Sequence, residues 1–283
     1  MAAKILVTGG AGFVGSNLLN KLINLGHDVV SLDDYSMGSA ANHVDGVEYV
    51  NGHTADIHKF FSEKFQAVYH LGEYSRVEQS FNDVHRVITN NTIGTAEVVK
   101  YCLKFKCRLI YAGSSTKFAN FSQGDESPYV TTKKCNTLLI NNLITAKLLD
   151  GVICYFYNVY GKNEISTGEY ATVIAKFLAM SRKNQSLPVV APGTQLRNFT
   201  SVNDIVSGLI ILLDQGTGDN FMIGSSQALS VIQLAEAIGS PYHFIEPKRG
   251  NRLSARIDTS KIEMLGWTAK GDVYDYITQQ KNH

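Results

Sequence analysis

Several features that mark special classes of protein are scarce or missing in this sequence. There are only 5 prolines and 4 cysteines among 283 residues, and 26 basic side chains nearly balance 25 acidic ones. No apolar run reaches the ~18 residues that a membrane-spanning helix needs. A nearly neutral chain has no overall field directed at nucleic acid or an anionic membrane, so we expect neither as a partner.

The cysteines exclude two further kinds of site. Cys102, Cys107, Cys135 and Cys154 lack the close paired spacing of a zinc site, so we expect no metal. In a chain of this length they do not suggest a disulfide framework either. The sequence starts almost directly with the apolar run Ile5–Thr8, which leaves no room for a signal sequence. We therefore expect a cytoplasmic protein with reduced thiols.

What the sequence does contain is a regular alternation of strand-length apolar runs and segments of helical period. In the first half, strands are expected at Ile5–Thr8, Val29–Asp33, Ala67–Leu71, Arg108–Ala112 and Val152–Phe156. Helices are expected between them at Gly15–Leu25, Thr92–Phe105 and Tyr129–Leu149. This rhythm predicts an α/β fold of the Rossmann type, a doubly wound parallel sheet with helices on both faces.

The pattern becomes less regular after Gly161. Helices are expected at Ala171–Ser181, Ser201–Leu213 and Val231–Ile238, and short strands at Asn220–Ile223 and His243–Ile245. We predict a dinucleotide-binding Rossmann domain over residues 1–161 and a smaller α/β lobe, mainly substrate-binding, over 162–283. The chain is expected to cross between the two.

A glycine-rich turn follows the first predicted strand and predicts a cofactor site. Gly9, Gly12 and Gly15 stand where a tight turn, close approach of a pyrophosphate and close helix packing require glycine. With Phe13 and Val14 they would present the first turn of a helix, whose free N–H groups attract phosphate. Glycines also simply make turns, but here a strand precedes them and a helix follows.

Acidic residues at the end of the second predicted strand indicate which dinucleotide is bound. The Asp33 carboxylate can accept hydrogen bonds from the adenosine ribose and would repel a 2′-phosphate. No Arg or Lys follows within Tyr35–Ala41, so NAD is favoured over NADP. Asp34 is a second candidate for this contact, although capping of a turn suits it better.

A candidate chemical centre lies further along the chain. Tyr129 and Lys133 are four residues apart and share one face of a predicted helix, so the ammonium can stabilise a phenolate. A phenolate is a general base that works near neutral pH. Such pairs are common on helix surfaces, but this one follows a strand that ends in Ser114, Ser115 and Thr116. Hydroxyls at that edge of the sheet could hold the substrate oxygen.

Together, the glycine turn, the serine cluster and the Tyr-x-x-x-Lys pair resemble the extended short-chain dehydrogenase/reductase family. The resemblance is to its nucleotide-sugar epimerases, dehydratases and decarboxylases, and it runs from residue 4 to about residue 268. Other matching stretches are Ala55–Ile57, His70–Gly72, Asn91–Thr95, Tyr157–Gly161, Gln195–Phe199, Lys248–Asn251 and Asp258–Lys261.

The resemblance implies a role for each matching residue. Those that would contact NAD, besides the glycine turn and Asp33, are Asp56, Ile57, Leu71, Gly72, Asn91, Tyr129 and Lys133. Those that would contact the sugar nucleotide are Ser75, Ser115, Thr116, Asn158, Arg197 and Arg249, the two arginines on its phosphates. The catalytic set would be Ser114, Tyr129 and Lys133. The family also implies a homodimer formed through the helices at 92–105 and 129–149.

The sequence departs from the family where the dehydratases carry an acidic pair. Ser115 and Thr116 occupy those positions and cannot perform that acid–base chemistry, so dehydration is disfavoured. We expect NAD-dependent epimerisation at C4 of a nucleoside-diphosphate sugar, a UDP-sugar, through a 4-keto intermediate. The alternatives are a UDP-glucuronate decarboxylase, a non-catalytic NAD or nucleotide-sugar binding protein and an NADP reductase.

Overall fold

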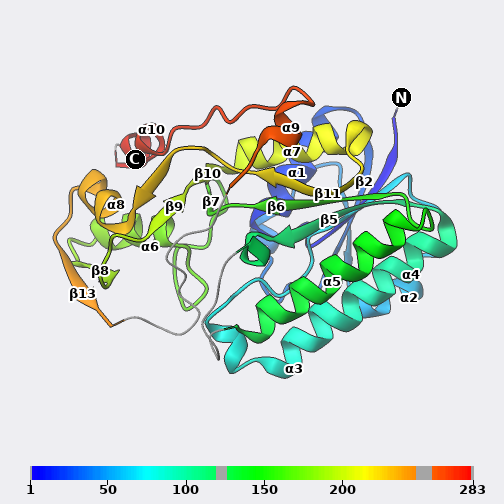
Figure 1. Ribbon diagram of the computed structural model, residues 1–283, viewed down its shortest axis with the longest axis horizontal. Helices are drawn as coiled ribbons and strands as arrows, with labels where there is room; N and C mark the ends of the chain where they lie inside the picture. Colours follow the sequence, from blue (N-terminus) through cyan, green and yellow to red (C-terminus); the bar gives the residue numbers. More distant parts are fainter. Residues whose placement is uncertain (1, 119–125, 247–256, 282–283) are drawn as a thin grey trace.

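The computed structural model describes residues 2–118, 126–246 and 257–281. Its centre is a seven-stranded sheet in the order β11-β6-β5-β4-β1-β2-β3, with every neighbouring pair parallel (Figure 1). The strands are β1 (Lys4–Thr8), β2 (Asp28–Asp33), β3 (Glu48–Asn51), β4 (Ala67–His70), β5 (Arg108–Ser114), β6 (Gly151–Phe156) and β11 (Gly218–Ile223). The predicted Rossmann-type sheet is confirmed. Its strand order reverses at β1, which lies between β2 and β4, and such a switch point opens a crevice for ligands.

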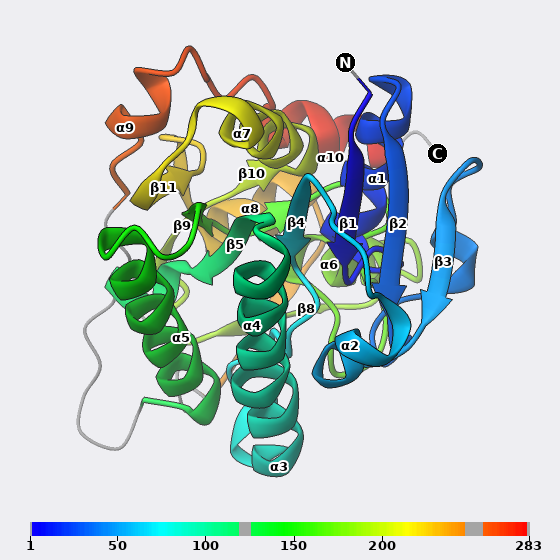
Figure 2. The same ribbon diagram turned by 90° about the vertical axis from the view of Figure 1, so that its right-hand side faces the viewer.

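Helices cover both faces of the sheet (Figure 2). On one face lie α1 (Phe13–Asn24) and α7 (Val202–Gln215), and on the other α4 (Thr95–Phe105) and α5 (Pro128–Thr145), with the short α2 (Ile57–Phe60) and α3 (Val84–Val87). In α1, Leu18, Leu19 and Leu22 are fully buried because they form the stripe that faces the sheet. On the opposite face, Val98 of α4 and Ile140 of α5 join a second core cluster.

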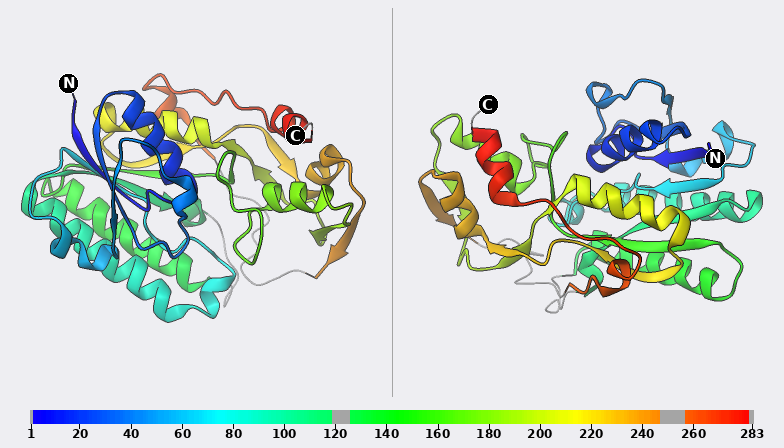
Figure 3. Two further views of the ribbon diagram at one scale, coloured as in Figure 1. Left: turned by 180° about the vertical axis from the view of Figure 1, so that it is seen from behind. Right: turned by 90° about the horizontal axis from the view of Figure 1, so that it is seen from above.

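A smaller lobe is built from the second half of the chain (Figure 3). It contains α6 (Val173–Ser181), α8 (Val231–Ile238), α10 (Val273–Lys281) and the parallel pair β8 (Leu187–Val190) and β13 (Tyr242–Ile245). Two further short pairs join β7 (Val159–Tyr160) to β10 (Thr200–Ser201), and β9 (Leu196–Asn198) to β12 (Ala228–Ser230). The lobe has its own apolar core, which includes Phe177, Val189 and Leu234.

The second half of the chain also contributes to the large sheet. β11 and α7 both come from beyond residue 161, and the short α9 (Ser260–Glu263) packs beside β11. Residue 161 therefore divides the sequence, but parts of the chain on both sides of it build the large sheet and the helices that cover it. The domain boundary stays a prediction. No helix in the described part of the chain has the length and apolarity to cross a membrane.

Side chains tie the first turn of α1 to the segment that enters the smaller lobe. The Asn17 side-chain amide donates to the carbonyl oxygen of Lys162 at 2.9 Å, and that of Asn163 donates to the Ser16 hydroxyl at 2.9 Å. These two hydrogen bonds join α1 to a segment about 145 residues further along the chain.

Candidate active site

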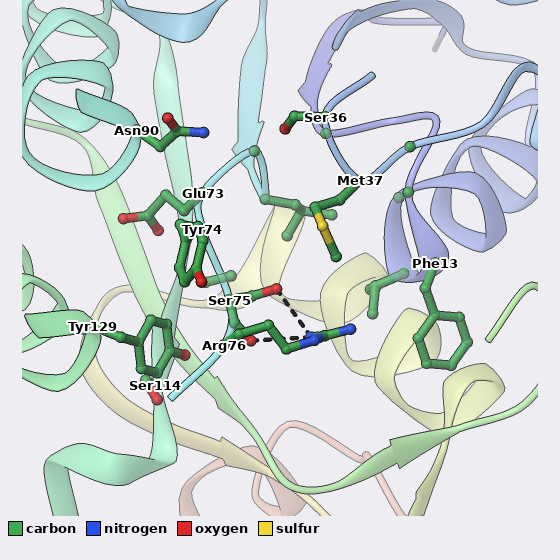
Figure 4. A pocket seen from close by; sticks show the side chains of 18 of the residues that line it. Phe13, Ser36, Met37, Glu73, Tyr74, Ser75, Arg76, Asn90, Ser114 and Tyr129 are labelled. Atoms are coloured by element: carbon green, nitrogen blue, oxygen red, sulfur yellow. Dashed lines mark hydrogen bonds between the residues drawn. The ribbon is translucent and has the colours of Figure 1, made fainter. Parts of the chain in front are cut away.

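A cavity of about 460 Å³ opens at the carboxyl edge of the sheet. One end is formed by the turn between β1 and α1, and the other by the ends of β5 and β6 and the start of α5. Between them runs the loop that follows β4, residues 71–77. The structure therefore brings the glycine turn and the Tyr129–Lys133 pair, far apart in sequence, to one continuous space (Figure 4).

The glycine turn has a shape that side chains would destroy. Gly9 has a φ of +74°, and a Cβ there would lie 2.8 Å from the Cα of Gly72. A Cβ on Gly15 would lie 2.0 Å from the carbonyl oxygen of Gly9. Gly12 precedes the first residue of α1 without any side-chain cap, and Phe13 and Val14 also line the cavity. This narrow cradle at an uncapped helix N-terminus fits the pyrophosphate of a dinucleotide.

Asp33 and Asp34 lie at the end of β2 and both line the cavity. The buried Asp33 carboxylate accepts from the backbone N–H of Ala11 at 2.9 Å and of Tyr35 at 2.8 Å, which fixes its position beside the glycine turn. Burial raises the pKa of Asp33, and the two backbone hydrogen bonds oppose that rise. Asp34 accepts from the N–H of Ser36 at 2.9 Å, so it also caps a turn.

Three residues expected to contact NAD do not line this cavity. Ile57 is fully buried in the core, and the Asp56 carboxylate pairs with Lys59 at 2.8 Å on the surface. Asn91 is fully buried too, where its side chain accepts from the N–H of Tyr74 at 2.7 Å and donates to its carbonyl oxygen. The structure does not bring these three side chains into the cavity, and their contact with NAD stays a prediction.

Neighbouring residues take the places of those three along the wall of the cavity. His53, Thr54 and Asn90 line it, and His53 and Asn90 are joined side chain to side chain at 3.2 Å. Leu71 and Gly72 line it as expected.

The predicted chemical centre is assembled at the other end of the cavity. Ser114 ends β5, and its hydroxyl lies 2.8 Å from that of Thr116. Tyr129 is the second residue of α5, which begins at Pro128 after Ser127 accepts a capping hydrogen bond from the N–H of Val130. The cap and proline fix where the helix starts and therefore where the tyrosine lies. Tyr129 and Ser114 face the same space in Figure 4.

Lys133 has a partner that the sequence did not reveal, the carboxylate of Glu73. The two side chains form an ion pair with only 7% and 2% of their surfaces exposed, and the ammonium also donates to the carbonyl oxygen of Ala112 at 2.6 Å. Glu73 accepts further hydrogen bonds from Asn136 and Thr95, each at 3.0 Å, and from Tyr111 at 3.2 Å. These donors together hold the Glu73 side chain in one position.

The network continues from Glu73 to the switch point of the sheet. Because the Thr95 hydroxyl donates to Glu73, it accepts from Nε2 of His70, 2.9 Å away. Nδ1 of His70 then accepts from the Thr8 hydroxyl at 2.8 Å, and that oxygen accepts from the N–H of Gly72 at 3.0 Å. Burial lowers the pKa of His70 to about 4, so the ring is neutral, as this pattern of donors requires.

The expected substrate contacts divide into three groups. Ser75, Ser115, Thr116 and Asn158 line the cavity. Arg197, on β9, does not line it, and its guanidinium donates to the carbonyl oxygen of Leu196 at 2.9 Å. Arg249 lies outside the described residues.

Two arginines that sequence reasoning missed do line the cavity. Arg76 lies in the loop after β4, and Arg86 in α3 donates to the carbonyl oxygen of Ser36 at 3.2 Å, near the acidic end of β2. Arg76 and Glu73 had one signal in the sequence, since charged residues directly after a buried central strand lie at the edge where ligands bind. Arg86 had no such signal in the sequence, because only the fold brings α3 to the end of the cavity near Ser36.

Comparison with known proteins agrees with this geometry. The family model described as "NAD dependent epimerase/dehydratase family" matches residues 5–224. A putative UDP-glucose 4-epimerase of Methanocaldococcus jannaschii is 28% identical over 98% of this chain and 97% of its own length. A UDP-N-acetyl-alpha-D-glucosaminuronate decarboxylase of Bacillus cytotoxicus is 29% identical over 86% of this chain and 81% of its own.

The solved structures show the same fold. An epimerase from Methanothermobacter thermautotrophicus superposes with a TM-score of 0.91 at 25% identity, covering 99% of this chain and 91% of that one. A UDP-glucose 4-epimerase from Thermotoga maritima, solved with UDP-glucose, gives a TM-score of 0.91 at 23% identity over 99% and 97% of the two chains.

Proposed function

Because the chain belongs to the NAD-dependent epimerase/dehydratase family, we propose that it inverts the C4 configuration of a nucleoside-diphosphate sugar. The observation that carries the proposal is that Ser114, Tyr129 and Lys133 surround one cavity that continues to the glycine turn. A cofactor held at that turn and a sugar held at Tyr129 would therefore meet within the same space.

In the proposed reaction Tyr129 removes the proton of the C4 hydroxyl, and the Ser114 hydroxyl holds the same oxygen by a hydrogen bond. NAD, held at the glycine turn, would supply the hydride chemistry at C4. Inversion at C4 requires that the protein let the 4-keto sugar turn over within the cavity. Lys133 stabilises the phenolate of Tyr129 by its charge, and the anchored Glu73 keeps that ammonium in place.

The choice of C4 epimerisation over dehydration rests on the residues after Ser114. Ser115 and Thr116 line the cavity at the positions where the related dehydratases carry acidic groups. Their hydroxyls can orient a sugar but are too weak as acids or bases to eliminate water from it. We further propose a UDP-sugar as substrate, with Asn158, which lines the cavity, near its diphosphate. The phosphate contacts expected of Arg197 and Arg249 stay predictions. Both curated relatives named above carry UDP-sugars in their names.

Isotope labelling tests this reaction directly. A UDP-hexose deuterated at C4 should keep its label at C4 in an epimeric product, and reaction in D₂O should add no deuterium to carbon. Solvent deuterium at C5 or loss of the C4 label would contradict simple C4 epimerisation. Release of carbon dioxide from UDP-glucuronate would instead assign a decarboxylase.

Substitution of Tyr129 tests the assignment of the base. Tyr129→Phe keeps the ring but removes the oxygen that takes the proton, so turnover should fall by ~10²–10⁴ while NAD binding survives. Tyr101→Phe is the matched control, since Tyr101 is buried in α4 and lies outside the cavity. Unchanged turnover in Tyr129→Phe would refute the mechanism.

A further inference from the structure

Arg76 carries a charge inside the cavity that no carboxylate of the described residues neutralises through an ion pair. Its Nε and Nη2 donate to the carbonyl oxygen of Tyr170 at 3.1 and 2.6 Å. Its Nη1 donates to the carbonyl oxygen of Ser75 at 3.0 Å and to the Ser75 hydroxyl at 3.3 Å. All these acceptors are neutral. They orient the guanidinium without compensating its charge, and a charge removed from water normally acquires an ionic partner.

The surroundings of Arg76 point to a partner that comes from outside the chain. Burial lowers the pKa of Arg76, and the largest opposing effect comes from Tyr129. Glu164 also acts on Arg76, but only weakly, and burial raises the pKa of this carboxyl to about 7. Glu164 is itself engaged by the Thr172 hydroxyl and the N–H of Gly161. Since no carboxylate of the described residues forms an ion pair with Arg76, a ligand anion would supply its counter-charge.

The position of Arg76 in the cavity indicates which anion would bind to it. Figure 4 shows its side chain beside Ser75, extending across the cavity between Tyr129 and Phe13. If Tyr129 faces C4 of a sugar ring, the nearest exocyclic carbon is C6, which is attached to the adjacent ring atom C5. The diphosphate is attached at C1, on the opposite side of the ring. The phosphates of the cofactor already have the glycine turn and the N-terminus of α1.

We propose that Arg76 binds a carboxylate at C6 of the substrate, so that the preferred substrate class is the nucleoside-diphosphate uronic acids. This inference rests on the proposed function, because it takes Tyr129 as the group that faces C4. The Nε and Nη2 atoms face the carbonyl oxygen of Tyr170, so a carboxylate would be bound by the N–H groups on the Nη1–Nη2 side of the guanidinium. The hydroxymethyl group of an ordinary hexose would leave this charge uncompensated.

Binding measured without turnover tests the inference. In the NAD-loaded full-length Tyr129→Phe protein, calorimetry should show UDP-glucuronate binding roughly 10–100 times more tightly than UDP-glucose, the value of a charge-assisted pair. Adding Arg76→Gln should remove most of this preference, and Arg76→Lys should restore part of it. Arg86→Gln is the matched control, an arginine of the same cavity near Ser36, and should leave the ratio of the two affinities unchanged.

The outcomes show whether Arg76 binds the C6 carboxylate, the diphosphate or NAD. They also distinguish failure of this inference from failure of the proposed reaction. Equal losses for UDP-glucuronate, UDP-glucose and UDP in Arg76→Gln would place the arginine on the diphosphate, and a loss confined to NAD would place it on the cofactor. Either result overturns the inference, as does a parent protein that does not prefer UDP-glucuronate. If the preference depends on Arg76 but wild-type enzyme releases carbon dioxide from UDP-glucuronate, the carboxylate site stands and C4 epimerisation fails.

Discussion

Replacing Glu73 by Gln removes the counter-charge of a lysine that is almost completely buried. The substitution keeps the size of the side chain, so the packing around it survives. Its amide nitrogen, however, cannot accept a hydrogen bond, and its single oxygen cannot serve both the Lys133 ammonium and the donors on the other carboxylate oxygen. Removing one partner of a buried ion pair costs about 3–5 kcal/mol because the other charge is left uncompensated.

That cost should be visible in thermal unfolding of the NAD-free protein. At about 2–4 °C per kcal/mol for a chain of this size class, Glu73→Gln should lower the melting temperature by roughly 6–20 °C. Asp56→Asn makes the same chemical change in an exposed pair, whose Lys59 and Asp56 side chains are 74% and 45% exposed. It should cost less than about 1 kcal/mol.

A double-mutant cycle isolates the pair from its surroundings. Lys133→Met together with Glu73→Gln should destabilise the protein less than the sum of the two single changes, by about 1 kcal/mol or more, because no unpaired charge remains. Additive effects, or a Glu73→Gln variant as stable as Asp56→Asn, would refute the view that Glu73 holds Lys133 in place.

Four further changes have expected outcomes. Asp33→Ala should weaken NAD binding by about 1–3 kcal/mol in calorimetry, and a wild-type protein that binds NADP more tightly than NAD would contradict the role of this carboxylate. Gly15→Ala should abolish NAD binding or folding, as judged by calorimetry and circular dichroism, because its Cβ would lie 2.0 Å from a carbonyl oxygen. The pKa of His70 is about 4 in the folded protein and ~6.5 in the unfolded chain, so the unfolded chain binds one more proton between these pH values and the protein loses stability as the pH falls from 6.5 to 4. In denaturant titrations the His70→Asn variant should lack this loss, and a free energy of unfolding that falls equally with pH in both proteins would contradict the prediction. We also propose a homodimer through α4 and α5, where Leu138 is 62% exposed, so Leu138→Glu should shift the protein to monomer in light scattering, whereas an unchanged mass would contradict that interface.

The fold was predictable from the sequence wherever burial imposed a clear period. The expected strand at Val152–Phe156 and the helix at Val231–Ile238 match the observed β6 and α8 within one residue. The expected helix at Thr92–Phe105 is different, since α4 begins at Thr95 after a π-helical stretch, Ile88–Gly94. Wide turns of this kind have no period that a sequence pattern reveals.

Four very short strands in the second half of the chain were missed for another reason. β9 and β12 have three residues each, and β7 and β10 have two, which is too short for an alternation of apolar and polar side chains to be visible. β3 was missed because its four residues are only partly buried or exposed. Such strands form because the tertiary structure brings them beside a partner strand, and the local sequence does little to indicate that pairing.

The candidate site was predictable where a motif fixes the backbone and not where side chains meet across the fold. The glycine turn, Ser114, Tyr129 and Lys133 all line the cavity as expected. The ion pair of Lys133 with Glu73 joins residues 60 positions apart, and no spacing rule could pair them. The orientation of Arg76 likewise depends on Tyr170, which is 94 positions away in the sequence.

The bonds between the first turn of α1 and the segment around Lys162 and Asn163 have a thermodynamic consequence. The same segment continues to Tyr170, whose carbonyl oxygen Arg76 holds. A cofactor bound at the N-terminus of α1 and a sugar bound by Arg76 would therefore each contact a residue that is hydrogen-bonded to one end of the segment 162–170. If one ligand raises the affinity for the other through this stretch, the second must raise the affinity for the first by the same factor, so saturation with one should lower the dissociation constant of the other.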